Sequence, residues 1–142
     1  MFSVGRRDGF VTMAKQGNIL TLRIHFDART EDIALAFELA TTMGWMHPGN
    51  QVLIDLRTYI GTVDWAIVRD LRRLAPWVDN GCTVCAYLLH NTQLNWLVQI
   101  VTAFYPRVHH RIFRDEAVAL SWLHEFSAQT QPGGDIRAGD AA

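Results

Sequence analysis

The sequence predicts one α/β domain with a small mixed sheet of about five strands and about four helices, in the order β-β-α-β-α-β-α-β-α. Short apolar runs rich in β-branched residues alternate along the chain with amphipathic segments of helical length. The chain has 142 residues, of which 49% are hydrophobic and 19% charged, a balance typical of a single globular core. We expect the domain to cover residues 1–126 and the segment 127–142, rich in small residues and turn formers, to be a disordered tail.

The first two predicted strands form a hairpin. They run from Gly9 to Lys15 and from Ile19 to Phe26, and a loop of Gln16, Gly17 and Asn18 separates them. These three residues favour tight turns. In the second run Ile19, Thr21 and Arg23 alternate with Leu20, Leu22 and Ile24. This is the period of a half-buried strand, so one face of the sheet is expected to be covered.

A helix is predicted to follow from Thr30 to Met43. Thr30 is a suitable N-cap, and the two acidic residues after it suit the positive end of the helix dipole. Gly44 is expected to end the helix, because glycine readily adopts the positive φ that follows the last turn. Next, the apolar run from Val52 to Leu56, interrupted only by Asp55, predicts a strand buried on both faces.

The second half of the chain repeats this alternation. A helix is predicted from Asp64 to Ala75, because Pro76 cannot continue it, and a buried strand from Thr83 to Leu89. A third helix is expected to begin at Asn91 or Thr92 and to end at Tyr105, before Pro106.

The last predicted elements are a strand from Val108 to Phe113 and a helix from Asp115 to Phe126. Strands that are joined through helices should pair in parallel with right-handed crossovers, whereas the opening hairpin adds an antiparallel strand. His109 and His110 lie among arginines on this last strand, and such charges commonly protect the edge of a sheet.

Charge and hydropathy exclude several classes of partner. The net charge is −1, so no bulk electrostatic field favours nucleic acid. The longest apolar segment, Leu94 to Tyr105, is too short to span a membrane, and no apolar stretch of a signal peptide follows Arg6 and Arg7. We therefore expect a soluble cytoplasmic protein whose two cysteines are free thiols.

The order of elements resembles the STAS-like domains, and within them the group similar to the SpoIIAA anti-sigma-factor antagonist. The resemblance is carried by three stretches: the strand Val52-Leu53-Ile54-Asp55-Leu56, the loop to Asp64, and the closing segment Arg111-Ile112-Phe113-Arg114-Asp115-Glu116-Ala117 with Ala119-Leu120-Ser121-Trp122-Leu123. It covers about Gly9 to Phe126, as an order of elements more than as identity.

The resemblance implies a regulatory fold without catalysis that binds a protein partner or, in neighbouring groups, an apolar or lipid-like ligand. The antagonists are switched by phosphorylation of a serine at the start of the helix after the Asp-Leu strand. Here that region reads Thr62-Val63-Asp64-Trp65 and holds no serine. Thr62 or Thr58 could take that role, and Asp64 could equally be only the N-cap of the helix.

A switch or ligand loop is predicted at the carboxyl end of the Asp-Leu strand, where open α/β sheets usually bind ligands. Its residues are Asp55, Thr58, Tyr59, Thr62 and Asp64. They contain no nucleophile and base pair that the sequence can identify, so we assign no catalytic residue and expect a protein that is not an enzyme.

No cofactor and no metal are expected. Cys82 and Cys85 form a C-x-x-C motif at the start of a strand, where their side chains point to opposite faces, and core packing is favoured over redox chemistry. A zinc site would need two further ligands, for which His90, His109 and His110 are candidates by residue type alone.

The third predicted helix carries apolar residues around almost its whole circumference, although a surface helix needs only one apolar stripe. Together with the first helix it could wall an apolar pocket or form a homodimer contact, with deep burial as the alternative. The residues chosen for this role are Leu39, Met43, Trp96, Ile100 and Phe104. Two functions follow: a regulatory domain that binds a protein, or a carrier or sensor of an apolar small molecule.

Overall fold

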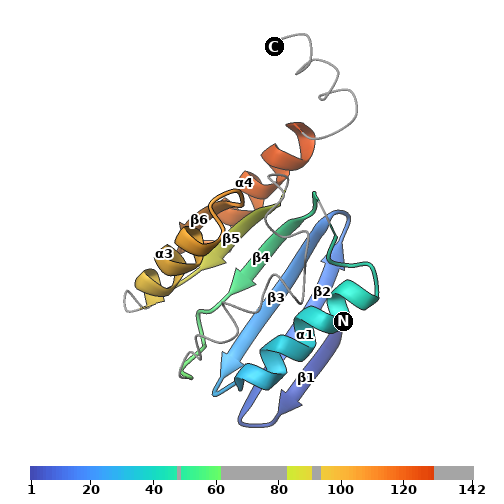
Figure 1. The fold of residues 1–142 in the computed structure, drawn as a ribbon, viewed down its shortest axis with the longest axis vertical. Helices are drawn as coiled ribbons and strands as arrows, with labels where there is room; N and C mark the ends of the chain where they lie inside the picture. Colours follow the sequence, from blue (N-terminus) through green and yellow to red (C-terminus); the bar gives the residue numbers. More distant parts are fainter. Residues whose placement is uncertain (48, 62–82, 91–93, 130–142) are drawn as a thin grey trace.

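The computed structural model describes residues 1–47, 49–61, 83–90 and 94–129, with the side chains of 127–129 left aside. They form a six-stranded sheet in the order β1-β2-β3-β4-β5-β6 with helices packed against it (Figure 1). In chain order the elements are β1 (Phe2–Arg6), β2 (Gly9–Gln16), β3 (Ile19–Phe26), α1 (Thr30–Thr42), β4 (Gln51–Asp55), β5 (Val84–Leu88), α3 (Asn95–Phe104), β6 (His109–Phe113) and α4 (Glu116–Gln129).

The sheet is mixed, as predicted. β1, β2 and β3 pair antiparallel, whereas β3 to β6 pair in parallel. The prediction missed β1, a short strand at the edge of the sheet that pairs with β2 and in which only Phe2 and Val4 are large apolar residues. β6 forms the opposite edge, which confirms the position expected for the strand rich in histidine and arginine.

The first helix confirms the predicted segment with one correction at its start. Arg29, not Thr30, is the N-cap, and its backbone N–H donates to the Asp32 carboxylate at 3.4 Å. Thr30 is already the first helical residue, so Asp32 satisfies the open helix end in place of the threonine hydroxyl. Gly44 follows the helix with φ of 74°, as its conformational freedom predicts.

The remaining helices differ from the prediction at their ends. α3 begins at Asn95, with Leu94 as its N-cap, and the predicted caps Asn91 and Thr92 lie outside the described residues. α4 starts as predicted, where Asp115 accepts a hydrogen bond from the Ala117 N–H at 3.0 Å, and it continues to Gln129. The helix predicted from Asp64 to Ala75 lies outside the described residues.

Two hydrophobic clusters lie on opposite faces of the sheet. Side chains of α1 and α3 contribute to the cluster on one face, which includes Cys85 and Tyr87 of β5. Ala119 and Leu123 of α4 belong to the cluster on the other face, with Val84, Ala86 and Leu88 of the same strand. The alternation of β5 between the two clusters shows that this strand is central, and all five of its residues are buried.

Helix α4 covers only part of its face. Among the described residues its main contacts are with β4, β5 and β6, and β1, β2 and β3 extend beyond it on the same face. The exposed part carries small and polar residues, among them Thr12, Ala14 and Thr21, each only partly buried. Polar residues at alternate positions of β2 and β3 are therefore explained by the narrow reach of α4.

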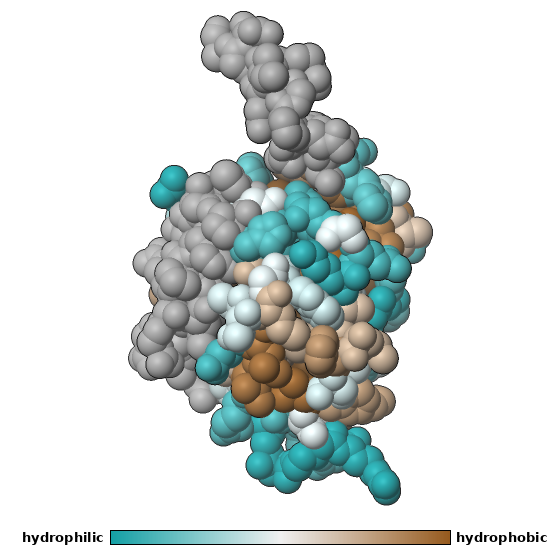
Figure 2. All heavy atoms as spheres, turned by 90° about the vertical axis from the view of Figure 1, so that its right-hand side faces the viewer, coloured by the Kyte–Doolittle hydropathy of each residue, from teal (hydrophilic) through white to brown (hydrophobic). Residues whose placement is uncertain are grey.

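The side of the molecule that bears β1 and α1 is partly hydrophobic. Figure 2 shows hydrophobic residues gathered below its middle, above a hydrophilic tip. Phe2 of β1 is 46% exposed and Leu35 of α1 is 43% exposed. In the described part of the chain, no helix is long and apolar enough to cross a membrane.

Leu123 tests how strongly α4 is held on the sheet, because its side chain is fully buried between the two. We expect Leu123→Ala to lower the free energy of unfolding by about 2–5 kcal/mol, through lost burial and the cavity left behind. Val118→Ala, at a position of the same helix that is 53% exposed, should change it by less than about 0.5 kcal/mol. Urea denaturation followed by circular dichroism measures both, and equal losses would show that α4 is not packed as described.

Candidate functional site

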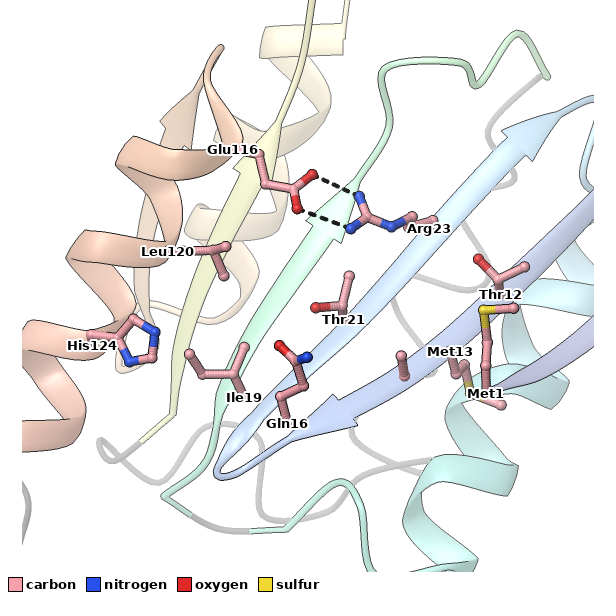
Figure 3. Close-up of a pocket in the computed structure, with 11 residues that line it drawn as sticks. Met1, Thr12, Met13, Gln16, Ile19, Thr21, Arg23, Glu116, Leu120 and His124 are labelled. Atoms are coloured by element: carbon pink, nitrogen blue, oxygen red, sulfur yellow. Dashed lines mark hydrogen bonds and ion pairs between the residues drawn. The ribbon is translucent and has the colours of Figure 1, made fainter.

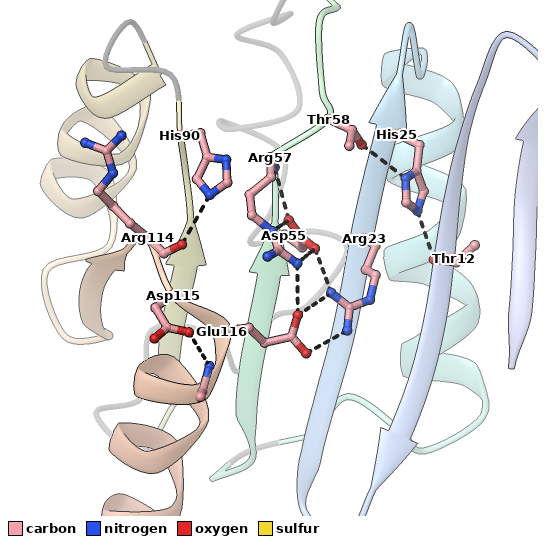
Figure 4. A network of polar contacts seen from close by, with 11 residues as sticks. Thr12, Arg23, His25, Asp55, Arg57, Thr58, His90, Arg114, Asp115 and Glu116 are labelled. Carbon is pink, nitrogen blue, oxygen red and sulfur yellow. Dashed lines mark hydrogen bonds and ion pairs between the residues drawn. The ribbon is translucent and has the colours of Figure 1, made fainter.

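Four charged side chains meet where β3 and β4 end and α4 begins (Figure 4). They are Arg23 of β3, Asp55 at the end of β4, Arg57 just after it and Glu116 at the start of α4. The parallel register of the two strands places Arg23 directly beside Asp55. We call these four residues the ion-pair network.

Each arginine of the network contacts both carboxylates. Arg23 donates to Asp55 at 2.6 Å and to the two carboxylate oxygens of Glu116 at 2.9 and 3.0 Å. Arg57 donates from two of its nitrogens to the Asp55 carboxylate at 2.9 and 2.8 Å, and to Glu116 at 2.9 Å. Bidentate pairs of this kind are among the stronger hydrogen bonds in proteins. Two positive and two negative charges therefore neutralise one another.

The network holds its carboxylates in the charged form. Burial alone would raise the pKa of Asp55, but hydrogen bonds from the side chain and backbone of Arg57 and from Arg23 outweigh it and lower the pKa to about 2. The pKa of Glu116 is lowered mainly by its hydrogen bonds with Arg23, against a smaller opposing effect of burial. Asp55 is 7% exposed, so this interaction is little screened by solvent.

A second set of polar contacts lies on the side of the network toward β2. The His25 ring lies within hydrogen-bond distance of the Thr58 hydroxyl at 3.1 Å and of the Thr12 hydroxyl at 3.4 Å (Figure 4). The Phe10 ring stacks on the imidazole with 4.7 Å between the ring centroids. His25 thus connects the loop after β4 to β2.

The loop after β4 is fixed to the end of β3 by backbone hydrogen bonds. The Phe26 N–H donates to the Thr58 carbonyl at 3.0 Å, and the Ile60 N–H donates to the Phe26 carbonyl at 2.9 Å. Between them Tyr59 is 6% exposed and belongs to the core. Burial raises the pKa of its phenol, and the charge of Asp27 adds to that effect.

Two large apolar side chains point outward from this fixed backbone. Phe26 is 45% exposed and Ile60 is 75% exposed. Phe26 also has φ of 54°, which is uncommon for a bulky residue. Together with Phe10, His25 and Thr58 they form what we call the strand-end surface.

Gly9, the first residue of β2, leaves room for the two residues that follow β3 beside this surface. A Cβ at position 9 would overlap the backbone of Asp27 and Ala28. The Asp27 N–H donates to the Asp8 carbonyl at 3.0 Å, which keeps the two segments in contact. A glycine is therefore required here for the close approach of two backbones.

The structure separates the residues of the predicted switch or ligand loop. Asp55 lies in the ion-pair network, Thr58 is exposed on the strand-end surface and Tyr59 anchors the loop in the core. Thr62 and Asp64 lie outside the described residues. The described three thus lie at or just after the end of β4 in three different environments, and their role as a switch or ligand loop stays a prediction.

Sequence reasoning missed Arg23 and Glu116 as members of the network around Asp55. In the sequence, 32 positions separate Arg23 from Asp55, and 93 positions separate Arg23 from Glu116. Only the strand register and the placement of α4 bring them together. The local signal was an arginine at one of the alternate polar positions of β3, beside Thr21 and His25.

The residues of the predicted apolar pocket or interface lie on two separate helices. Leu39 and Met43 belong to α1 and its C-cap, are partly buried and pack against the core. Trp96 and Phe104 of α3 are 47% and 49% exposed, and Ile100 lies between them. α1 packs on β1 and β2, whereas α3 packs on β6, so the two helices stand over opposite ends of the same face.

The C-x-x-C motif is described only at its second cysteine. Cys85 is buried in the core beneath α1 and α3. Burial raises the pKa of its thiol to about 12, against a smaller effect of the hydrogen bond with Tyr87. The thiol is therefore protonated at neutral pH and behaves as a core side chain. Cys82 lies outside the described residues.

Comparison with known proteins identifies the fold. No protein-family model matches the sequence, and no curated protein matches it either. The structure is similar to that of an uncharacterized protein of the DUF3478 family with a SpoIIAA-like fold, from Shewanella loihica PV-4. The TM-score is 0.57 at 18% identity, over 87% of this chain and 99% of that chain.

The chain therefore has a SpoIIAA-like α/β fold, and the resemblance drawn from its order of elements is confirmed at the level of the fold. At this identity the comparison establishes the fold alone, since one fold hosts many functions. Function has to be argued from the surfaces described above.

Asp55 offers a test of the network through pH. Its pKa is about 2 in the folded protein against an ordinary 3.8, so its charge stabilises the fold above about pH 4 and loses that effect as pH falls toward about 2. We expect Asp55→Asn to lower the free energy of unfolding by about 2 kcal/mol at neutral pH. The gap to wild type should narrow on acidification, which urea denaturation at about pH 7 and about pH 2.5 measures.

Asp8→Asn is the matched control for this experiment. Its carboxylate is 68% exposed and makes one contact of 3.8 Å with Arg6. Such an exposed pair should contribute less than about 0.5 kcal/mol. A loss in Asp55→Asn that stays the same at both pH values would contradict the charge-based role of the network.

Proposed function

We propose that this chain is a non-catalytic regulatory or binding domain that acts by contact with a protein partner through the strand-end surface. The observation that supports it is the pair Phe26 and Ile60, exposed by 45% and 75% on a backbone that hydrogen bonds and a buried tyrosine hold in place. Large apolar side chains that stand exposed together commonly mark interaction sites.

A fixed backbone favours binding, because little conformational entropy remains to be lost when a partner docks. The loop is tied to Phe26 on both sides of Tyr59, and the ion-pair network holds the strand ends beneath it. Phe26 keeps a positive φ despite its conformational cost. An unfavourable backbone angle held by its surroundings supports a functional role for the residue that adopts it.

The strand-end surface also has the composition of an interface. Phe26 and Ile60 supply the apolar centre, and Thr58 and His25 supply hydrogen-bonding groups at its margin. Protein interfaces combine an apolar centre with a polar rim in this way. Of the residues predicted from the sequence, Thr58 thus offers an exposed hydroxyl to a partner, and Tyr59 supports the loop from inside.

Site-specific photo-crosslinking tests this proposal. A photoreactive phenylalanine analogue at position 60 should give one discrete adduct with a partner protein in extracts of the native cells. The same analogue at Val118, which is exposed by 53% on α4, should give no such adduct. The adduct is identified by mass spectrometry and the partner is then purified for binding measurements.

The purified partner should bind Ile60→Ser and Phe26→Asn at least about tenfold more weakly than wild type, since central apolar residues dominate interface energetics. Asparagine tolerates the positive φ of position 26, and Ile60 is 75% exposed. Both variants should therefore keep the fold and its stability within about 0.5 kcal/mol. Identical adducts at positions 60 and 118, or unchanged affinity in both variants, would refute the proposal.

A second candidate function is a carrier or sensor of an apolar small molecule on α3. Trp96, Ile100 and Phe104 are spaced by four residues and therefore lie along one side of the helix. The two aromatic side chains are each about half exposed. An apolar ligand laid along this stripe would shield both of them.

Ligand-dependent thermal stability tests this candidate. If it is right, a fatty acid such as oleate should raise the Tm of the protein by several degrees, and Trp96→Ala with Phe104→Ser should abolish the shift. Phe2→Ser, at a phenylalanine of 46% exposure on β1, serves as the control and should leave the shift unchanged. A Tm indifferent to a panel of fatty acids would exclude the candidate.

A further inference from the structure

A groove runs beside α4 over the open part of the sheet. It encloses about 260 Å³ and lies between α4 and the strands β2 and β3 (Figure 3). Within the part of the chain that the structure describes, α4 packs mainly on β4, β5 and β6, and the groove lies over the neighbouring strands β2 and β3 on the same face.

The wall of the groove is formed by side chains of α4 and its floor by residues of β2 and β3, and the residue spacings of α4 and β3 nearly match. Glu116, Leu120 and His124 are spaced by four residues along α4, which corresponds to about 6 Å along a helix. They lie along residues 23, 21 and 19 of β3 (Figure 3), and two strand residues span about 6.6 Å. Because the two repeats nearly match, the side chains of α4 form a wall beside β3 at three successive positions, while the helix itself packs mainly on β4, β5 and β6.

The groove is deep over β2 and β3 because the residues of its floor have small side chains. Ala14 of β2 lies directly beside Thr21 of β3 in the sheet register, and both line the groove. Neither side chain is large enough to fill the space between α4 and Met1, which closes the far side. The hollow is therefore created by side-chain size as well as by the reach of α4.

The lining combines apolar surface with hydrogen-bonding groups. Leu120 and Ile19 supply apolar surface. Gln16, Thr21 and His124 also face the groove (Figure 3), and their side chains form no hydrogen bond within the part of the chain that the structure describes. Small-molecule sites typically have this mixture of apolar walls and a few convergent polar groups.

The charged residues of the groove are already satisfied. Arg23 and Glu116 close one end and bind each other through two hydrogen bonds of 2.9 and 3.0 Å. A charged ligand would have to compete with this bidentate pair, which is worth more than a single hydrogen bond. The groove therefore suits an uncharged ligand.

We propose that the groove binds a small uncharged ring compound that carries an amide-like edge. The ring would pack against Leu120 and Ile19 above the small floor. The side-chain amide of Gln16 offers a donor and an acceptor side by side, and the hydroxyl of Thr21 offers either, which matches an amide edge. The volume is slightly below the roughly 300 Å³ at which pockets for drug-sized ligands begin, so one ring system is the appropriate size.

Three probes of the same shape and different charge test the proposal: benzamide, benzoate and benzamidine. They are titrated to about 5 mM into isotopically labelled protein, and NMR shifts are followed. Benzamide should give saturable shifts confined to residues that line the groove. The anion and the cation should bind about tenfold more weakly or not at all, because Arg23 and Glu116 already bind each other.

Two variants locate the site. Ala14→Leu should remove benzamide binding by filling the floor, and Thr21→Val should weaken it severalfold by removing the hydroxyl without changing the volume. Thr102→Val on α3, where the hydroxyl bonds to the Val98 carbonyl, is the control and should leave affinity unchanged. Unfolding curves of each variant verify that the fold is retained.

The proposal is overturned by any of four results: no saturable shift with benzamide, equal affinity for all three probes, shifts centred elsewhere, or binding that persists in Ala14→Leu. Because the groove and the strand-end surface share none of the residues substituted in the two sets of experiments, failure here would leave the proposed protein contact untouched.

Discussion

The ion-pair network is the interaction on which the arrangement of this molecule depends. It joins β3, β4 and the first turn of α4, three elements far apart in the chain, through two arginines that each bind both carboxylates. Asp55 is almost fully buried, and a buried charge is tolerated only when it is paired and hydrogen-bonded. The network therefore fixes where α4 starts relative to the sheet.

Both proposed surfaces follow from that position. On one side of the network, the ends of β3 and β4 are held together, and the loop that carries Ile60 is pinned to Phe26. On the other side, α4 begins with Glu116 beside Arg23 and packs on β4, β5 and β6, so that its side chains form one wall of the groove over Ala14 and Thr21. The ion-pair network thus lies between the strand-end surface and the groove, and its residues Arg23 and Glu116 line one end of the groove.

The two surfaces differ in chemistry and so in the partners they suit. The strand-end surface holds large apolar groups outward, which favours contact with another protein. The groove is small and partly polar, and its arginine and glutamate bind each other, which favours a small uncharged molecule. The SpoIIAA-like fold seen in the similar structure is compatible with either, because a fold supplies the framework and the local residues supply the function.

The sequence alone determined the class of fold, the order of the described elements after β1 and the parallel arrangement of the later strands, because apolar periodicity and helix-ending residues are local signals. It also pointed to the carboxyl end of β4. It did not reveal β1, a five-residue edge strand with few apolar residues, nor the partners of Asp55. Those depended on strand register and on the reach of α4, which are decided by packing between distant segments, and no local pattern of residues encodes a contact that spans 93 positions.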